Sequence, residues 1–232
     1  EILFKYLKIP LKIKKTKKLD FIEVKGKKNF KCFNYNIPSD ISSSAYFVVL
    51  TLLAKKSSLT IKNVNINPSR TGSIDILNKM GAKIIIKNKK NYKGEHVGDI
   101  YVRSAKSLKA INCPTKYNSA AIDEFLIIFL VAAKAKGISY FKDLAELNQK
   151  ESPRLKLGSK ILNMIGIKTE LTNHSIKIYG QPNLDLKKSY KIKNYLKDHR
   201  IFMMSTIAAL TLGGNWKIYD SDSIKTSFPL FL

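Results

Sequence analysis

The stretch Ile76-Leu-Asn-Lys-Met-Gly-Ala-Lys83 recurs 85 residues later as Ile161-Leu-Asn-Met-Ile-Gly-Ile-Lys168, with five of the eight positions identical. In both copies the glycine is expected to close a helix, and a strand follows it. Long apolar helices are predicted to begin near residues 41, 119 and 199, which is a similar spacing. The sequence therefore predicts a repeated unit of helix, strand, helix, strand and strand, packed pseudo-symmetrically within one globe.

Helices and strands alternate along the whole chain. Helices are predicted at about 2–8, 41–54, 73–80, 118–135, 153–165 and 198–212, and strands near 9–14, 20–25, 30–36, 59–64, 82–87, 99–103, 109–112, 138–141, 167–172, 175–179 and 215–219. Ser39 or Asp40 is expected to cap the second helix, Ser152 the fifth and Asp198 the sixth. The run Phe125 to Val131 is hydrophobic nearly all round, so its helix should lie in the centre of the globe.

The chain of 232 residues carries a formal charge of +25, from 42 Lys plus Arg against 17 Asp plus Glu. Such a charge first suggests nucleic acid or an anionic membrane surface as the partner. The lysines are dispersed, however, and are not interleaved with aromatic residues as in a base-stacking surface. The longest apolar runs, 45–54 and 125–133, fall short of the roughly 20 residues that span a bilayer. We therefore expect no specific nucleic acid and no membrane as partners.

Two cysteines, Cys32 and Cys113, are too few for a disulfide scaffold and have no partner at zinc-ligand spacing. They are interpreted as structural thiols, which predicts a cytoplasmic location. The first residues carry no cleavage signature, so we expect no signal peptide. The absence of an initiator Met suggests that the sequence begins inside a longer protein.

Only four of the basic residues are arginines: Arg70, Arg103, Arg154 and Arg200. Arginine grips a carboxylate or phosphate with two parallel hydrogen bonds, which lysine cannot do. Arg103 lies in an alternating strand and is interpreted as structural. The other three precede helices, where they are either functional or members of surface ion pairs.

Four short motifs place charged residues at predicted helix starts: Asn67 to Gly72, Asn118 to Glu124, Lys150 to Arg154 and Asp198 to Arg200. Each one alone is explained by helix capping and the helix dipole. If the repeats pack about a common axis, these helix ends gather on one face. That face would form a funnel for a small, multiply anionic substrate. We find no metal-ligand spacing, Gly-rich phosphate loop or nucleophile elbow.

These residues, in this order, resemble the 5-enolpyruvylshikimate-3-phosphate (EPSP) synthase family of enolpyruvyl transferases. The resemblance rests on Ile37-Pro-Ser-Asp-Ile-Ser-Ser-Ser-Ala45, Asn67-Pro-Ser-Arg-Thr-Gly72, Ile122-Asp-Glu124, Glu146-Leu-Asn-Gln-Lys-Glu-Ser-Pro-Arg154, Asp198-His-Arg200 and Thr226-Ser-Phe-Pro229. It implies an α/β (α+β) fold with two pseudo-threefold globes of βαβαββ units and a site between them. Residues 1–36 would end the N-terminal globe and 37–232 would form the C-terminal one, so the N-terminal half of the enzyme is missing.

The resemblance also implies a reaction and its catalytic residues. The enolpyruvyl group of phosphoenolpyruvate (PEP) moves to the 5-hydroxyl of shikimate 3-phosphate, and phosphate is released without a cofactor. Asp123 would act as the base or hydrogen-bond partner at the reacting hydroxyl. Glu151 and Lys150 would transfer protons at the methylene and the bridging oxygen of PEP.

The implied substrate contacts come from the same motifs. Arg154 and Arg200 resemble the clamp on the PEP carboxylate and phosphate, with His199 beside it, Lys150 also in contact and Glu146 on the shikimate side. Where some members carry a Lys, this chain has Thr226, with Lys225 beside it. Loss of either clamp arginine is expected to abolish PEP binding and leave the fold intact. The alternatives are a non-catalytic fragment of the same fold and a basic nucleic-acid-binding module.

Overall fold

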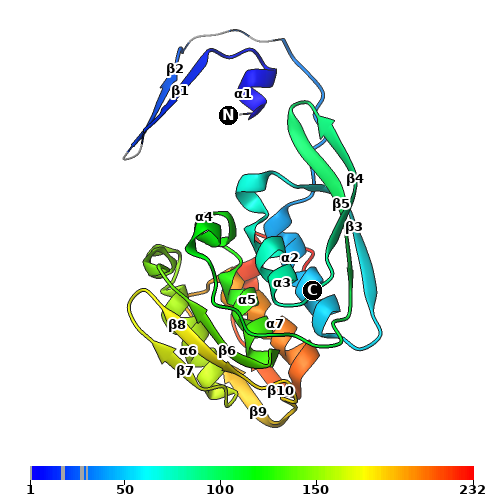
Figure 1. The fold of residues 1–232 in the computed structure, drawn as a ribbon, viewed down its shortest axis with the longest axis vertical. Helices are drawn as coiled ribbons and strands as arrows, with labels where there is room; N and C mark the ends of the chain where they lie inside the picture. Colours follow the sequence, from blue (N-terminus) through cyan, green and yellow to red (C-terminus); the bar gives the residue numbers. More distant parts are fainter. Residues whose placement is uncertain (1, 17–18, 27–28, 30) are drawn as a thin grey trace.

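Three apolar helices form the centre of the molecule: α2 (Ile41–Leu53), α5 (Phe125–Lys134) and α7 (His199–Leu212). Each helix packs against the other two (Figure 1). Every residue from 125 to 133 is buried, as expected for a helix that is hydrophobic on all sides. The structure is a computed structural model that describes residues 2–16, 19–26, 29 and 31–232.

Two three-stranded antiparallel sheets lie on either side of these helices (Figure 1). The first has the order β3-β5-β4 and the second the order β6-β8-β7, so the two units share one topology. A second helix lies between the first two strands of each unit. The bounds are β3 (Ser58–Asn65), α3 (Gly72–Lys79), β4 (Ile85–Tyr92) and β5 (Glu95–Arg103), and then β6 (Gly137–Phe141), α6 (Arg154–Met164), β7 (Thr169–Leu171) and β8 (Ile176–Gly180).

The repeated sequence has the same structure in both units. Gly81 and Gly166 follow α3 and α6 with φ angles of +99° and +85°, a conformation that glycine adopts without strain. The side-chain oxygen of Asn78 accepts the backbone N–H six residues further on at 2.9 Å, and that of Asn163 does the same at 3.2 Å. The repeated asparagine therefore ties each helix to the next strand, and the predicted repeat is confirmed.

A third unit surrounds α7. The strands β9 (Leu186–Ile192) and β10 (Gly213–Ile218) precede and follow this helix and pair in parallel. In the other two units, isolated parallel bridges occupy the same place, between Ser39 and Val64 and between Asn112 and Tyr140. Each central helix thus connects two parallel segments, which is a βαβ connection.

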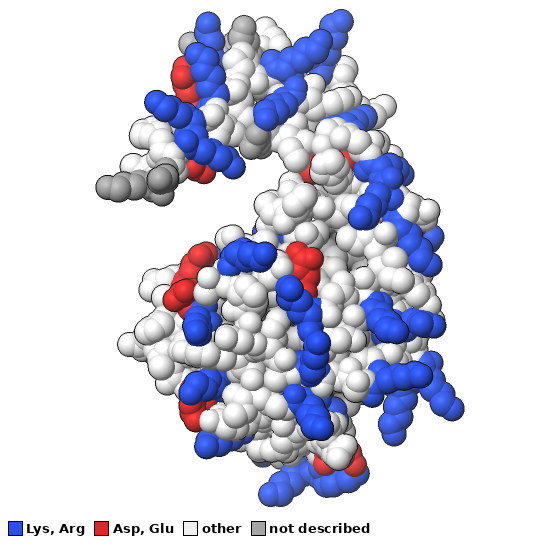
Figure 2. All heavy atoms as spheres, viewed as in Figure 1, with Lys and Arg blue, Asp and Glu red and all other residues white. Residues whose placement is uncertain are grey.

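The first residues form a separate segment at the top of Figure 1, with α1 (Ile2–Tyr6) and the antiparallel strands β1 (Leu11–Lys15) and β2 (Asp20–Val24). Figure 2 shows an open space between this segment and the main body. The two meet at the tip of the β4–β5 hairpin, where Lys93 Nζ lies within 6.0 Å of the ring centres of Tyr6, Phe33, Tyr35 and Tyr92. The apolar side chains of β2 remain exposed.

The strands of the structure differ from the prediction in three places. Residues 31–36 form no strand, while residue 30 lies outside the described residues. The strand expected near 109–112 is reduced to isolated bridges. The strand β9 was not expected at all, because its lysine-rich sequence has few apolar residues. It forms because Leu186, Tyr190 and Ile192 are buried in the hydrophobic core and the strand pairs with β10.

Two helix starts also differ. The predicted helix at 118–135 is interrupted at residues 122–124, which separate α4 (Asn118–Ala121) from α5. The carbonyl oxygen of Asp123 accepts a hydrogen bond from Arg200 Nη1 at 2.8 Å. This oxygen therefore bonds to a side chain and not to a backbone N–H of a continuous helix. Pro153, rather than Ser152, is the N-cap of α6, because the Ser152 hydroxyl donates to Asp198 at 2.7 Å.

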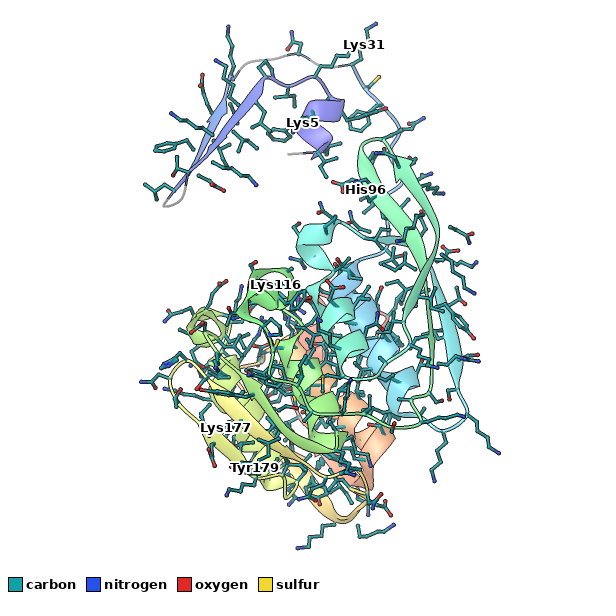
Figure 3. All side chains as sticks on the ribbon, in the orientation of Figure 1. Lys5, Lys31, His96, Lys116, Lys177 and Tyr179 are labelled. Carbon is teal, nitrogen blue, oxygen red and sulfur yellow. The ribbon has the colours of Figure 1, made fainter. Side chains whose placement is uncertain are left out.

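Two of the three histidines lie on the surface. His96 is exposed on β5 near the hairpin tip, and His174 is exposed in the turn before β8. Figure 3 shows the first of them, together with Lys177 and Tyr179 on β8. Among the described residues, no helix is long and apolar enough to cross a membrane.

Asp99 on β5 stabilises the irregular register of the first sheet. Its carboxylate accepts the Asn63 backbone N–H (2.9 Å), the Asn88 amide (2.8 Å) and the Lys62 ammonium (3.1 Å). These hydrogen bonds, that of Asn63 above all, lower the pKa of Asp99 from 3.8 to about 2. Because a lowered pKa adds stability that is full above the unfolded pKa, this stability is lost as the pH falls from about 4 to 2.

We therefore expect Asp99→Asn to lower the Tm at pH 7, and the difference from the wild type to shrink between pH 4 and pH 2. Thermal unfolding followed by circular dichroism measures both. An equal difference in Tm at pH 7 and pH 2 would contradict this role of Asp99.

Candidate active site

The N-terminal ends of the three central helices meet on one face, and each begins at an acidic residue. Asp40 caps α2 by accepting the Ser43 N–H at 2.7 Å, and Asp198 caps α7 by accepting the Arg200 N–H at 2.9 Å. Glu124 stands at the N-cap of α5. The predicted gathering of helix ends is therefore present, and a cluster of ionised side chains lies there.

The carboxylate of Asp123 is the centre of this cluster. Lys150 Nζ lies 3.7 Å from its Oδ1, and Arg154 Nη1 lies 3.6 Å from the same oxygen. Arg70 Nη1 and Arg200 Nη2 lie 3.6 and 3.8 Å from Oδ2. One fifth of the Asp123 side chain is exposed, so the group is open to a ligand while surrounded by four cations.

Arg154 and Asp198 form a buried ion pair beside this centre. Arg154 is 1% exposed, and its Nε and Nη2 donate to the two Asp198 oxygens at 2.9 and 3.3 Å. Burial acts to raise the pKa of Asp198, but the hydrogen bond and charge of Arg154 outweigh it, so that pKa lies below 3.8. The pair fixes the start of α6 against the start of α7.

A second buried carboxylate belongs to Glu124, which is 1% exposed. Its Oε1 accepts the Ser42 hydroxyl at 2.5 Å and lies 3.9 Å from Arg200 Nη1. The Ser42 oxygen in turn accepts a hydrogen bond from Arg70 Nη2 at 2.8 Å. Burial raises the pKa of Glu124 above 4.5, although the Ser42 hydrogen bond and the Arg200 charge oppose this shift.

The more exposed residues of the cluster come from η3 (Ala145–Gln149) and the loop that follows it. Lys150 Nζ contacts Glu146 at 3.1 Å as well as Asp123. Glu151 contacts Arg154 Nη2 at 2.5 Å and is more than half exposed. Lys150 therefore bridges two carboxylates at the solvent edge, a suitable place for proton exchange with a bound ligand.

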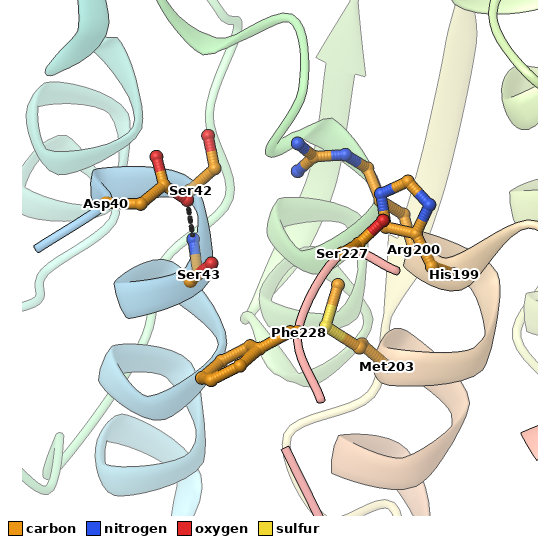
Figure 4. Close-up of a pocket in the computed structure, with 8 residues that line it drawn as sticks. All are labelled: Asp40, Ser42, Ser43, His199, Arg200, Met203, Ser227 and Phe228. Carbon is orange, nitrogen blue, oxygen red and sulfur yellow. Dashed lines mark hydrogen bonds between the residues drawn. The ribbon is translucent and has the colours of Figure 1, made fainter. Parts of the chain in front are cut away.

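His199 lines a small pocket of about 200 Å³ between the starts of α2 and α7 (Figure 4). In this view its imidazole lies next to Ser227, whereas the Arg200 guanidinium extends away from that segment. Burial and the adjacent Arg200 charge lower the pKa of His199 from its ordinary value of 6.5, which favours the neutral imidazole. The pocket is also lined by Asp40, Ser42, Ser43, Met203 and Phe228.

The structure brings together the site residues named from the sequence: Asp123, Glu146, Lys150, Glu151, Arg154, His199 and Arg200. Arg70 joins them, whereas Arg103 lies at the other end of α2 in a groove of about 1010 Å³. No contact within the described part of the chain joins Lys225 to the cluster. The buried links through Ser42 and Glu124 were missed, because capping alone explains Glu124 in the sequence and nothing there indicates a role for Ser42.

The cluster combines a carboxylate that can accept a proton with cations that can hold phosphate or carboxylate groups. Within the described ranges, no group of three or more His, Cys, Asp or Glu side chains is placed to hold a metal ion. The arrangement is suited to proton transfer on an anionic ligand.

Comparison with known sequences places these features in one family. The sequence model described as EPSP synthase (3-phosphoshikimate 1-carboxyvinyltransferase) matches residues 3–232. Relatives named 3-phosphoshikimate 1-carboxyvinyltransferase include those of Ruthia magnifica subsp. Calyptogena magnifica, 41% identical over 207 residues, and Hydrogenovibrio crunogenus, 38% over 221. The matches cover 89% and 94% of this chain but 47% and 49% of the relatives. The chain thus spans about half the length of the curated relatives it matches.

Solved structures lead to the same family as the sequence comparison. EPSP synthase from Acinetobacter baumannii matches with a TM-score of 0.88 at 32% identity, over 99% of this chain and 51% of that one. An enolpyruvyl transferase from Streptomyces tendae matches with a TM-score of 0.64 at 13% identity, which shows a shared fold alone. The predicted α/β architecture of repeated units with buried central helices is confirmed.

Proposed function

The chain belongs to the EPSP synthase family, and we propose that it forms the PEP-side half of an active site that transfers the enolpyruvyl group of PEP to the 5-hydroxyl of shikimate 3-phosphate. The observation that carries the proposal is the open Asp123 carboxylate, within 3.8 Å of one lysine and three arginines. Such a cluster can hold an anion and accept a proton beside it, which addition of a hydroxyl to PEP requires.

We assign the proton transfers to the exposed edge of the cluster. Asp123 takes the proton of the attacking hydroxyl while the new C–O bond forms at PEP. Glu151 supplies the proton that reaches the methylene carbon, which becomes a methyl group in the adduct. The C–O bond to phosphate then breaks, and phosphate leaves with a proton that Lys150 gives to the bridging oxygen. At the same time a methyl proton returns to Glu151, which restores the C=C bond of the enolpyruvyl group. Lys150 Nζ lies 3.7 Å from Asp123 Oδ1, so the proton that Asp123 takes from the hydroxyl can pass to Lys150. The scheme requires no cofactor.

The cations differ in how readily they can reach PEP. Side chains of Arg70 and Arg200 are 42% and 13% exposed, so both can turn donors to a ligand. Arg154 is enclosed by Asp198, Asp123 and Glu151. It can contact PEP only if one of these carboxylates moves away from it. Of the two clamp arginines that the resemblance implies, Arg200 is thus the one that can reach PEP. We assign it as the main PEP clamp, with His199 beside it and Glu146 as a contact on the shikimate side.

The charges of the cluster support the need for a second half. Four cations meet five carboxylates: Asp123, Glu124, Glu146, Glu151 and Asp198. Because PEP carries both a phosphate and a carboxylate, further cations must come from another globe. We propose that residues 1–36 end that first globe and that residues 37–232 form the second, since β2 leaves Phe21 and Ile22 exposed. We also propose a cytoplasmic location, consistent with two free cysteines.

Arg200→Ala tests the assignment, with Arg103→Ala as the matched control. Titration of the isotope-labelled chain with PEP, followed by NMR, should shift amide signals at the start of α7 in the wild type. We expect Arg200→Ala to weaken PEP binding at least tenfold, because it removes the guanidinium assigned as the main PEP clamp, and Arg103→Ala to leave it unchanged. Equal PEP affinity in all three proteins would contradict the proposal.

The complete reaction requires an assembled pair, which we define as this chain bound to the N-terminal half of a family member. The intact family enzyme serves as the positive control for the assay. Phosphate release is then measured with PEP and shikimate 3-phosphate together.

A further inference from the structure

The proposed chemistry does not use Glu124, although this carboxylate lies directly next to Asp123 in the sequence. Glu124 is 1% exposed, and burial of an unpaired charge is strongly unfavourable. An acidic residue at a helix start is ordinarily explained by capping. The Glu124 side chain, however, makes no capping hydrogen bond to α5. Its position therefore needs another explanation.

The polar contacts of Glu124 lead to two arginines. Its Oε1 lies 3.9 Å from Arg200 Nη1, and it accepts the Ser42 hydroxyl at 2.5 Å. Because Ser42 also accepts from Arg70 Nη2 at 2.8 Å, this hydroxyl joins the carboxylate to the second arginine. Four elements meet here: α2, η1 (Pro68–Arg70), α5 and α7.

Both of these arginines also face Asp123, from which Arg70 Nη1 and Arg200 Nη2 are 3.6 and 3.8 Å away. Long side chains lose considerable freedom when they are held in one place, so something must hold them. The buried Glu124 carboxylate supplies part of that restraint. It attracts Arg200 at 3.9 Å, beside the hydrogen bond from Arg200 Nη1 to the Asp123 carbonyl oxygen, and it accepts the Ser42 hydroxyl that holds Arg70.

We infer that Glu124 is a positioning residue, which holds Arg200 directly and Arg70 through Ser42 so that both face Asp123. Its effect on catalysis rests on the proposed function, whereas its effect on the two arginines does not. The inference assigns Glu124 to the alignment of the cations, and no proton transfer to substrate is assigned to it.

The scarcity of arginine allows a direct test. The chain has four arginines, so an NMR spectrum that detects the arginine Nε–H groups contains at most four signals, which single Arg→Lys variants assign. Glu124→Met removes both charge and acceptor, and we expect the Nε–H exchange of Arg70 and Arg200 with water to become at least tenfold faster. Arg154, held by Asp198, and Arg103, outside the cluster, are internal controls.

Two further variants separate the direct link from the indirect one. Ser42→Ala should loosen Arg70 alone. Glu124→Gln keeps an acceptor for Ser42 but has no charge, and it should loosen Arg200 alone. Unchanged exchange at Arg70 and Arg200 in all three variants would overturn the inference, and so would equal loosening of all four arginines in each of them.

Kinetics of the assembled pair give an independent readout. If Glu124 acted only through its charge, Glu124→Met would make the site more positive and lower the KM for PEP. Loss of positioning instead predicts that this KM rises at least tenfold. A lower or unchanged KM would count against the inference. If the wild-type pair releases no phosphate, the proposed function fails, while arginine exchange still decides the role of Glu124.

Discussion

Arg154→Ala is expected to lower the free energy of unfolding by about 3–5 kcal/mol, because it leaves a buried carboxylate without its cation. Arg154 is 1% exposed, and the side chain of its partner Asp198 is fully buried. After the change, Asp198 keeps only the Ser152 hydroxyl and the Arg200 backbone N–H as donors. Urea unfolding at pH 7, followed by circular dichroism, measures the loss.

A compensating change provides the control for this experiment. Asp198→Asn in the Arg154→Ala background removes the unpaired charge but keeps a side chain suited to a helix N-cap. We expect the double variant to regain at least about 1 kcal/mol relative to Arg154→Ala alone. A loss below about 1 kcal/mol in Arg154→Ala would contradict this view of the ion pair. The sequence suggested that the fold would survive this substitution, and the burial of Arg154 changes that expectation.

Asp123→Asn is expected to reduce the kcat for phosphate release by about 10²–10⁴-fold, the usual contribution of a positioned general base. Asparagine has nearly the same shape but cannot take the proton of the attacking hydroxyl. PEP should bind as well or more tightly, because four cations lose a competing carboxylate. The kcat and the KM for PEP of the assembled pair measure the two effects separately.

Asp75→Asn is the matched control, because Asp75 is an exposed acid in the first turn of α3. It should leave both kinetic constants unchanged. A fall in kcat of less than tenfold in Asp123→Asn, or a loss of PEP affinity that accounts for the whole effect, would show that Asp123 binds substrate rather than accepting the proton.

Much of the fold could be predicted because it depends on local pattern. The repeat around Gly81 and Gly166, the apolar run at 125–133 and the cap at Asp198 all follow from residues close together in the chain. The helix break at 122–124 could not be predicted in this way. It depends on Arg200, 77 residues from Asp123, whose side chain uses a carbonyl oxygen that a continuous helix would need.

The candidate site, like the fold, could be predicted only where local sequence indicates it. The scarcity of arginine directed attention to Arg70, Arg154 and Arg200, which the structure brings together at Asp123. The Ser42–Glu124 contact joins residues 82 positions apart, and nothing local to either one indicates it. Only tertiary packing shows that this carboxylate is buried and needs partners.

The central claim is that this chain supplies one half of an EPSP synthase active site. It is tested most directly by measuring phosphate release from PEP and shikimate 3-phosphate, with the chain alone, the N-terminal half alone and the assembled pair. We expect release from the pair only, and its loss when the chain carries Asp123→Asn. No release from a pair that gel filtration shows to be assembled, while the intact family enzyme is active in the same assay, would contradict the claim.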